Sequence, residues 1–270
     1  MECAPSKNKS IYGCFDTSAL HRIIYLYNIK YDDQIKLNGN ETDKTLWKYI
    51  QSKMYNVCGK KDNIETEICW LDNTFLESDT VLNAYYKPKK PIGKYKWLKT
   101  LDITKVLKQY ESLFPNFLFF GTVPLDFEEI LYEYANINMC KIYDKKFTKI
   151  GFVFNLDTSD KKGSHWVCMF IDITPNNQAP YIAYFDSYGH QPPREIYNFM
   201  LKLKKQILNC LNINMIIKRN KKRHQYSGSE CGMYCVCIIF LLLSGNSFEE
   251  INNKRISDED VNSLRDIFFR

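Results

Sequence analysis

No apolar run in this 270-residue sequence is long enough to cross a membrane. The longest dense run, Met233–Leu243, falls well short of the roughly 20 residues that a spanning helix needs. The chain also starts without the basic-then-apolar order of a secretory signal. We therefore expect a soluble protein that is not secreted.

A strong charge of one sign is missing as well. Lys and Arg number 37 and Asp and Glu number 31, which leaves a net charge of +6. This mild surplus favours encounter with acidic surfaces, but it is far from the basicity of a protein that wraps nucleic acid. With 45% apolar and 25% charged residues, the composition is that of an ordinary globular protein, so disordered and fibrous classes are excluded.

The ten cysteines lack the spacing of a metal site. Zinc ligands usually come as separated Cys-x2-Cys pairs, whereas Cys231, Cys235 and Cys237 crowd one apolar, helix-like segment. The remaining cysteines are scattered through a chain large enough to fold without cross-links. We therefore expect a reducing compartment rather than a disulfide framework, and no metal or other cofactor.

The composition of the chain shifts once, at a stretch rich in lysine and proline. Upstream, residues 18–27 and 41–57 are helix-like, the second with apolar residues near a 3.6-residue period. Residues 87–96 indicate an extended charged linker, because two prolines and a glycine prevent regular pairing. The sequence thus predicts a small helical N-terminal arm domain at 1–86 and a second domain at 97–270.

The second domain alternates helix-like stretches with short apolar runs. The runs have the pattern of strands in a sheet covered on both faces, and they lie at 166–171, 181–185 and 213–217. Helices are expected at 102–114, 126–134 and 229–243. The last, capped by Ser229, is apolar on nearly all faces and should lie buried against the sheet. The predicted fold class is α/β (α+β), with a mixed central sheet and a buried helix beside the helical arm.

Polar residues with catalytic chemistry fall at the ends of these elements, where side chains can reach a cleft. Cys231 is near the start of the buried helix, whose unpaired N–H groups and dipole can lower a thiol pKa from about 8.5 to ~3.5–7.5. His165 could take the thiol proton, and Asp186 could orient the imidazole. Gln225 and the main-chain N–H of Cys231 could stabilise an oxyanion. Together they fit nucleophilic acyl transfer.

Taken singly, each of these residues also has a purely structural explanation. A histidine before a strand is often only a hydrogen-bonded residue, and the Asp-Ser-Tyr-Gly segment at 186–189 is often only a turn. A half-buried cysteine is usually inert. The combination of the four residues is what points to catalysis.

The order His165, Asp186, Gln225, Cys231 resembles a clan of cysteine proteases. The clan holds the adenovirus endopeptidase, the SUMO-processing proteases and the core proteases of large DNA viruses. Its His-Trp dipeptide and its Gln-x5-Cys-Gly spacing are both present, whereas papain runs Cys, His, Asn. The likeness spans roughly residues 95–270. It implies a cysteine protease with a His-Asp-Cys triad on the buried nucleophile helix and Gln225 at the oxyanion.

Within the clan, residues 184–193 and 255–270 are most similar to one viral branch. This branch holds the polyprotein protease of African swine fever virus and its poxvirus and giant-virus relatives, which carry a helical N-terminal arm. The swine fever enzyme has Asn where this chain has Asp186. The likeness implies an endopeptidase that cuts structural precursor polyproteins after Gly-Gly-type or Ala-Gly-type pairs during virion maturation. Its expected location is the host cytoplasm, at the assembly site, and the virion.

The resemblance also implies how glycine would be selected. Residues 97–102 look like the clan's Trp-Leu-Asn-Asp opening motif with its polar pair altered. The matching clan tryptophans, here Trp97 and Trp166, flank the cleft as a narrow apolar slot that admits glycine and excludes a Cβ. Either indole could instead be a core aromatic.

Two other functions stay open on the sequence alone. A SUMO or ubiquitin-like deconjugating protease, acting on a Gly-Gly-ended protein, would share the triad and the slot. A basic nucleic-acid-binding protein without catalysis would use the run at 218–223, although only Tyr226 lies near it to stack on bases. A weak contact with DNA, as a helper of the protease, is a further expectation.

Overall fold

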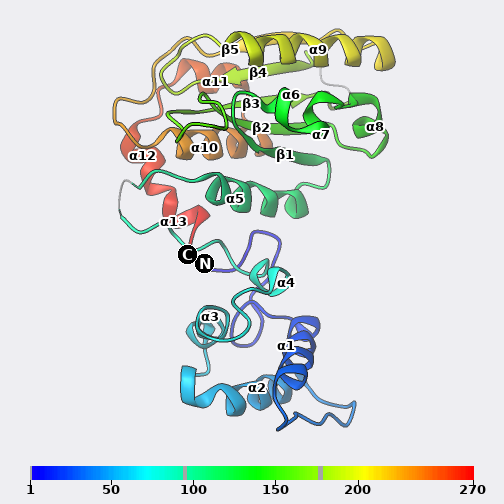
Figure 1. The fold of residues 1–270 in the computed structure, drawn as a ribbon, viewed down its shortest axis with the longest axis vertical. Helices are drawn as coiled ribbons and strands as arrows, with labels where there is room; N and C mark the ends of the chain where they lie inside the picture. Colours follow the sequence, from blue (N-terminus) through cyan, green and yellow to red (C-terminus); the bar gives the residue numbers. More distant parts are fainter. Residues whose placement is uncertain (1, 94–95, 176–178) are drawn as a thin grey trace. The chain divides into compact units, whose positions relative to one another are not determined.

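The computed structural model describes residues 2–93, 96–175 and 179–270, which form two compact units (Figure 1). The first unit holds Met1–Lys89 together with Phe269–Arg270, and the second holds Lys90–Phe268. The division falls within the linker that the sequence predicts at 87–96, of which Lys94 and Tyr95 lie outside the described residues.

The last two residues belong to the first unit, whereas the sequence predicts a second domain that runs to residue 270. Within the first unit, the guanidinium of Arg270 donates to both carboxylate oxygens of Asp72, at 2.8 and 3.0 Å. Its main-chain N–H donates to the carbonyl oxygen of Pro88 at 3.0 Å. These bonds explain why Phe269 and Arg270 belong to the arm.

The first unit is built around helices. Those described are α1 (Thr17–Lys30), α2 (Asp43–Cys58), α3 (Ile64–Asn73) and α4 (Thr80–Asn83), and the first two confirm the predicted helices. Each starts at an Asp, Thr or Asn whose side chain accepts a main-chain N–H of the first turn. The helices pack on a common hydrophobic core that contains Trp47 and Trp70, whose ring centroids are 4.8 Å apart.

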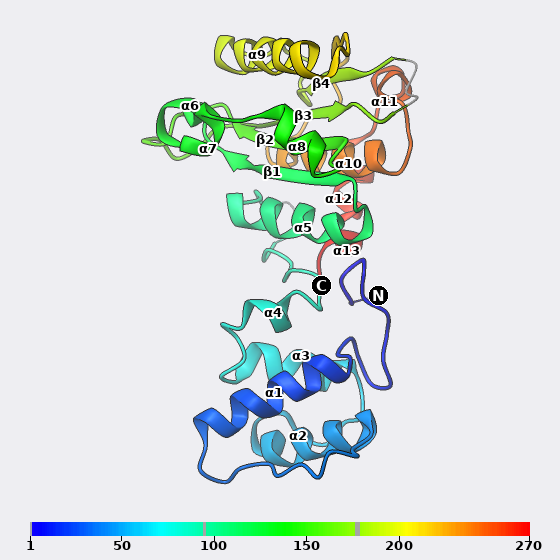
Figure 2. The ribbon, with the colours of Figure 1, turned by 90° about the vertical axis from the view of Figure 1, so that its right-hand side faces the viewer.

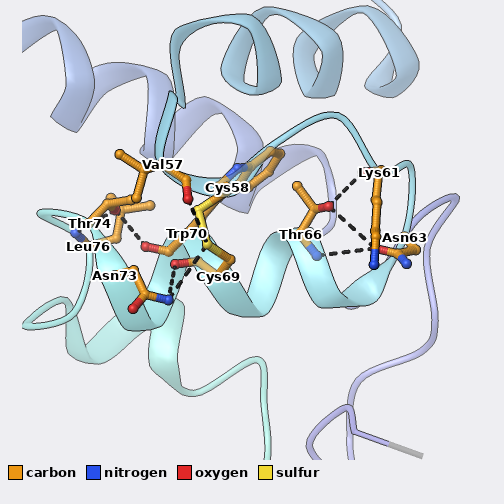
Figure 3. The surroundings of a disulfide bond; sticks show 10 residues. All are labelled: Val57, Cys58, Lys61, Asn63, Thr66, Cys69, Trp70, Asn73, Thr74 and Leu76. Atoms are coloured by element: carbon orange, nitrogen blue, oxygen red, sulfur yellow. Dashed lines mark hydrogen bonds between the residues drawn. A yellow bond between two sulfur atoms is a disulfide. The ribbon is translucent and has the colours of Figure 1, made fainter. Parts of the chain in front are cut away.

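Six of the ten cysteines are paired, so the expectation that there is no disulfide framework is wrong. The pairs are Cys3–Cys14, Cys58–Cys69 and Cys140–Cys210, with Cα atoms 5.4, 5.7 and 6.1 Å apart. Figure 3 shows the second pair joining the end of α2 to α3 beside Trp70. The pairs could not be predicted from the spacing of these cysteines in the sequence, because only the folded chain brings the partners together.

A five-stranded mixed sheet forms the centre of the second unit, in the order β1-β2-β3-β4-β5. The strands are β1 (Phe117–Val123), β2 (Lys149–Asn155), β3 (Trp166–Asp172), β4 (Tyr181–Phe185) and β5 (Ile216–Arg219). The outer pairs are parallel and the two inner pairs antiparallel. The predicted fold class and the strands at 166–171 and 181–185 are confirmed. The third run starts later than expected, and β5 is partly exposed because it lies at the edge of the sheet.

The parallel pairs are joined by helices. Between β1 and β2 lie α6 (Phe127–Ile130), α7 (Tyr132–Ala135) and α8 (Met139–Asp144). The single helix expected at 126–134 is thus divided, because Leu131 is extended. Between β4 and β5 lies α9 (Arg194–Leu211).

Helices cover both faces of the sheet, with α9 on one side and α5 (Thr100–Leu113) and α10 (Cys231–Leu243) on the other (Figures 1 and 2). In one core cluster, Met169 of β3 packs with Phe199 and Leu203 of α9. On the other face, a Cβ added to Gly151 would lie 3.5 Å from Ile239 of α10. The prediction of a buried helix against the sheet is confirmed. This packing places Cys231, the first residue of α10, close to the sheet.

The N-cap of α10 is Glu230 and not Ser229. Three short helices follow α10: α11 (Phe248–Asn253), α12 (Asp258–Ser263) and α13 (Arg265–Phe268). In the part of the chain that the structure describes, no helix combines the length and apolar character needed to cross a bilayer.

Candidate active site

His165 and Asp186 are brought together by the antiparallel pairing of β3 and β4. His165 directly precedes β3 and Asp186 directly follows β4, so both lie at the same edge of the sheet. The imidazole Nε2 is 2.7 Å from the carboxylate Oδ1. This contact leaves Nδ1 as the nitrogen that can face a nucleophile.

The Asp186 carboxyl is completely buried, and its main chain is clamped by a neighbouring side chain. Asn220, which follows β5, accepts the Asp186 N–H at 2.9 Å and donates its amide to the Asp186 carbonyl oxygen at 2.6 Å. Because β5 runs parallel to β4, the residue after β5 reaches the residue after β4. In the sequence Asn220 is inconspicuous because it lies within the basic run at 218–223.

Cys231 is the first residue of α10, and its side chain is buried. The surroundings are tight: a Cβ added to Gly232 would lie 3.0 Å from Leu98 Cβ and 3.2 Å from Trp166 Cδ1. Trp166 is held there because its indole N–H donates to the Leu98 carbonyl oxygen at 2.9 Å. Glycine after the cysteine therefore lets the helix start approach the sheet closely.

The position of Cys231 at a helix start predicts a lowered pKa for its thiol, and this prediction is wrong. Burial raises the pKa of Cys231 to about 12, and the charge of Glu230 adds to the rise. The main-chain N–H groups of Trp166 and Gly232 favour the thiolate, but they do not outweigh the loss of hydration. The thiol keeps its proton in this structure, so a base must remove it when the thiol reacts.

Gln225 is fully buried and held by several hydrogen bonds. Its side-chain oxygen accepts from the Ser187 hydroxyl at 2.6 Å, and its amide nitrogen donates to the Ser227 carbonyl oxygen at 2.9 Å and to the Tyr188 hydroxyl at 3.3 Å. The main-chain N–H of Gln225 donates to the Ser187 carbonyl oxygen at 2.9 Å. The segment after Asp186 thus fixes Gln225, whose role at an oxyanion stays a prediction.

The loop before the nucleophile is held by two carboxylates that are not among the residues singled out from the sequence. Glu230 is fully buried and accepts from the hydroxyls of Ser227 and Ser229. Asp258, at the start of α12, accepts the main-chain N–H groups of Tyr226 and Ser227 at 2.9 and 3.3 Å. The serines before the cysteine were the available signal, because short hydroxyl side chains commonly bond to nearby groups in turns.

The two tryptophans of the predicted slot are placed differently. Trp166 is 5% exposed and packs beside Gly232, whereas Trp97 is partly exposed. Leu98, which follows Trp97, supplies the acceptor for the Trp166 indole. The slot itself stays a prediction.

Side chains of the basic run at 218–223 bond within the second unit. Lys218 pairs with Glu249 at 2.6 Å, Lys222 donates to the Asn253 carbonyl oxygen at 2.6 Å, and Arg223 donates to that of Gln225 at 2.7 Å. These bonds favour a supporting role for the run, and contact with DNA stays a prediction. Among the described residues, no group of three or more His, Cys, Asp or Glu side chains is placed to hold a metal ion.

Comparison with known proteins decides the family. The sequence profile of the Ulp1 protease family, C-terminal catalytic domain, matches residues 138–270. A putative thiol protease, R355 of Acanthamoeba polyphaga mimivirus, is 31% identical over 99% of this chain and 93% of its own length. The chain belongs to the Ulp1 family of cysteine proteases.

The SUMO-1 cysteine protease S273R of African swine fever virus is 27% identical to this Ulp1-family protease, over 84% of this chain and 92% of its own. The crystal structure of the pS273R protease of that virus has a TM-score of 0.68 at 22% identity, covering 100% of this chain and 96% of the other. The second relationship shows a shared fold. The match with the mimivirus protein extends over both units of this protease.

Proposed function

We propose that this cysteine protease is an endopeptidase that cuts viral structural precursor polyproteins after Gly-Gly-type or Ala-Gly-type pairs. The observation that carries the proposal is the contact of His165 Nε2 with Asp186 Oδ1 at 2.7 Å. At the same end of β3, the main-chain N–H of Trp166 contacts the Cys231 thiol. Support for a viral substrate comes from the relatives, which are proteases of a mimivirus and of African swine fever virus.

In the proposed reaction, Cys231 Sγ attacks the carbonyl carbon of the scissile peptide while His165 Nδ1 accepts the thiol proton. Asp186 stabilises the resulting imidazolium through its contact with Nε2. The imidazolium then donates its proton to the leaving amine, and an acyl-enzyme thioester remains. Water, deprotonated by His165, attacks the thioester, which releases the carboxylate product and restores the Cys231 thiol.

The raised pKa of Cys231 fits this use of His165 as a general base. A thiol that is protonated at rest reacts only slowly with passing electrophiles, and it becomes strongly nucleophilic when a bound substrate and the imidazole are aligned. The developing oxyanion is stabilised by the Cys231 N–H and by the Gln225 amide. The Gln225 amide nitrogen donates two hydrogen bonds, to the Ser227 carbonyl oxygen at 2.9 Å and to the Tyr188 hydroxyl at 3.3 Å. The bond to Tyr188 is the longer one and is the easier to replace by a bond to the oxyanion.

Selection of a small residue before the scissile bond follows from the wall beside the nucleophile. Trp166 and Leu98 already lie close to the Gly232 main chain, so a substrate side chain at this wall would displace the carbonyl from Cys231. A shift of about 1 Å from attack geometry can cost about a hundredfold in rate. Trp97 would close the other side of the slot.

The test is to incubate the protein with a peptide library and with the virus's own structural precursor, and to sequence the cut sites. We expect cleavage after Gly-Gly or Ala-Gly, and at least tenfold slower cleavage of a matched Gly-Ala peptide. The Trp166→Ala variant should lower this discrimination together with the rate. Equal cleavage of both peptides by the wild type would refute the slot and the maturation specificity.

A second candidate is removal of a ubiquitin-like modifier, because the swine fever virus relative is named a SUMO-1 cysteine protease. A SUMO-1 fusion with the same Gly-Gly site as the precursor separates the two functions. Faster cleavage of the fusion than of the precursor or any peptide would favour deconjugation.

A further inference from the structure

We infer that Tyr188 is a positioning residue of this protease, which holds His165, Asp186 and Gln225 in their working arrangement. The inference rests on the proposed roles of these three groups. It is carried by the ring, the hydroxyl and the main-chain N–H of Tyr188, each of which contacts a different one of them.

The Tyr188 ring stacks on the imidazole of His165, with ring centroids 4.7 Å apart and planes inclined by 24°. A single hydrogen bond between His165 and Asp186 would leave the imidazole free to turn about the axis of that bond. A ring lying against the imidazole face removes this rotation. The stack therefore fixes the direction in which Nδ1 points, which is the direction of proton transfer.

The main chain of Tyr188 fixes the carboxylate. Its N–H donates to Asp186 Oδ1 at 2.8 Å, and this is the oxygen that meets His165 Nε2. The turn that allows this bond continues through Gly189, whose φ is +80°, and the Gly189 N–H donates to the Asp186 carbonyl oxygen at 2.8 Å. A Cβ at Gly189 would lie 2.8 Å from the Lys221 carbonyl oxygen. The turn is thus closely packed, and it carries the Tyr188 ring back to the imidazole.

The hydroxyl of Tyr188 acts on the proposed oxyanion donor. It accepts from the Gln225 amide at 3.3 Å and donates to the Ser227 carbonyl oxygen, also at 3.3 Å. Ser227 accepts from the same amide at 2.9 Å, so the three groups form a closed set. In the substrate-free enzyme the hydroxyl keeps one amide N–H aligned, and the oxyanion takes that N–H when it forms.

Tyr188 is itself held in place. The guanidinium carbon of Arg223 lies over the Tyr188 ring, 5.0 Å from its centroid, and also over the Tyr226 ring at 4.7 Å. Tyr226 is 63% exposed and lies against a second arginine, Arg255, at 4.6 Å. Tyr226 therefore offers a matched control: it is an aromatic residue that shares Arg223 with Tyr188 but is largely in solvent.

The experiment compares Tyr188→Phe, Tyr188→Leu and Tyr226→Leu in the full chain, with kcat and KM measured separately on a Gly-Gly peptide. We expect Tyr188→Leu to lower kcat by about 10- to 100-fold, since misplaced acid–base and attacking groups lose factors of this size, with KM changed less than about twofold. Tyr188→Phe keeps the stack and should recover most of this loss, apart from a few-fold decrease from the missing hydroxyl. Tyr226→Leu should match the wild type.

A second measurement reports the stack without relying on activity. The carbon-bound imidazole protons of His165, observed by NMR, should be shifted upfield in the wild type and in Tyr188→Phe by the ring current, and the shift should disappear in Tyr188→Leu. Circular dichroism and the Tm establish that the variants are folded. A loss of kcat in Tyr188→Leu no larger than in Tyr226→Leu, a change confined to KM, or an unchanged His165 spectrum would each overturn the inference. The proposed function fails by a different result, namely unchanged activity of Cys231→Ala.

Discussion

His165 meets Asp186 through Nε2, which lies 2.7 Å from the carboxylate Oδ1. Since Asp186 is fully buried and its main chain is bonded on both sides by Asn220, the carboxylate is a fixed point to which the imidazole is attached. The sheet therefore fixes the point at which the His165 imidazole is anchored, and the Tyr188 ring stacked on it sets the direction of Nδ1. This relationship determines which substitutions should be severe.

Cys231→Ala and His165→Ala should each abolish peptide cleavage, lowering kcat/KM by about 10³-fold or more, with no further loss in the double variant because the two groups act as one unit. Asp186→Asn should be milder by at least roughly tenfold, since an amide oxygen can still accept the imidazole N–H. The measurement is kcat/KM with Tm as a folding control. Cys235→Ala, in the same buried helix, should retain activity. An Asp186→Asn variant as inactive as His165→Ala would mean that the negative charge itself is indispensable.

The alkylation rate of Cys231 should depend on pH in a defined direction. Burial raises the pKa of this thiol to about 12, so the reactive thiolate is a minor species at neutral pH and its fraction grows about tenfold for each pH unit. We expect the rate with iodoacetamide to rise continuously from pH 6 to pH 9 in the substrate-free protein, as followed by mass spectrometry of the Cys231 peptide. A rate that reaches a plateau below pH 7 would instead indicate a thiolate already formed at rest.

Gly232→Ala should lower both stability and activity. The added Cβ would lie 3.0 Å from Leu98 Cβ and 3.2 Å from Trp166, and overpacking of this kind typically costs about 1–3 kcal/mol. Because the strain falls beside the nucleophile, kcat should fall more than the change in Tm alone explains. Gly228→Ala is the matched control, since a Cβ there meets no atom within 4 Å. Equal behaviour of the two variants would show that the helix start tolerates a larger separation.

Denatured, unreduced protein should show four free thiols, those of Cys168, Cys231, Cys235 and Cys237, by titration with a thiol reagent. Replacing the bridge Cys140–Cys210, which closes the longest of the three loops, by two serines should lower the free energy of unfolding by about 2–4 kcal/mol. Activity at low temperature should persist, because none of the proposed catalytic groups is in a bridge. Ten titratable thiols in the unreduced protein would contradict the pairing.

The candidate catalytic residues could be singled out from the sequence because their signals are local, and their catalytic roles stay predictions. A strand followed by Asp186, and a helix-like segment opened by Cys231, are visible in short stretches of the chain. Asn220 could not be predicted as a support, since its role depends on β5 pairing in parallel with β4. The prediction of a lowered pKa for Cys231 was wrong for a related reason. The helix start is a local feature, but the burial that raises the pKa comes from the sheet packed against it.

Other parts of the fold were missed because their patterns are weaker than the contacts that stabilise them. The strand β2 contains Gly151, which a β-strand interior disfavours, and its space is filled by Phe117 and Ile239 from other elements. The disulfide bonds likewise join residues whose proximity is created only by the fold, as in the 70-residue separation of Cys140 and Cys210.

The first unit is discontinuous in the sequence, since Phe269 and Arg270 complete it from the other end of the chain. An arm made only of the residues before the linker would have a single border with the protease domain. In this protein the chain passes from one unit to the other twice, after Lys89 and after Phe268. Its last residue, Arg270, bonds to both Asp72 and Pro88 of the arm. A deletion of residues 1–89 would therefore leave the guanidinium and the main-chain N–H of Arg270 without these partners, so a truncation of the arm also has to remove or replace the last two residues.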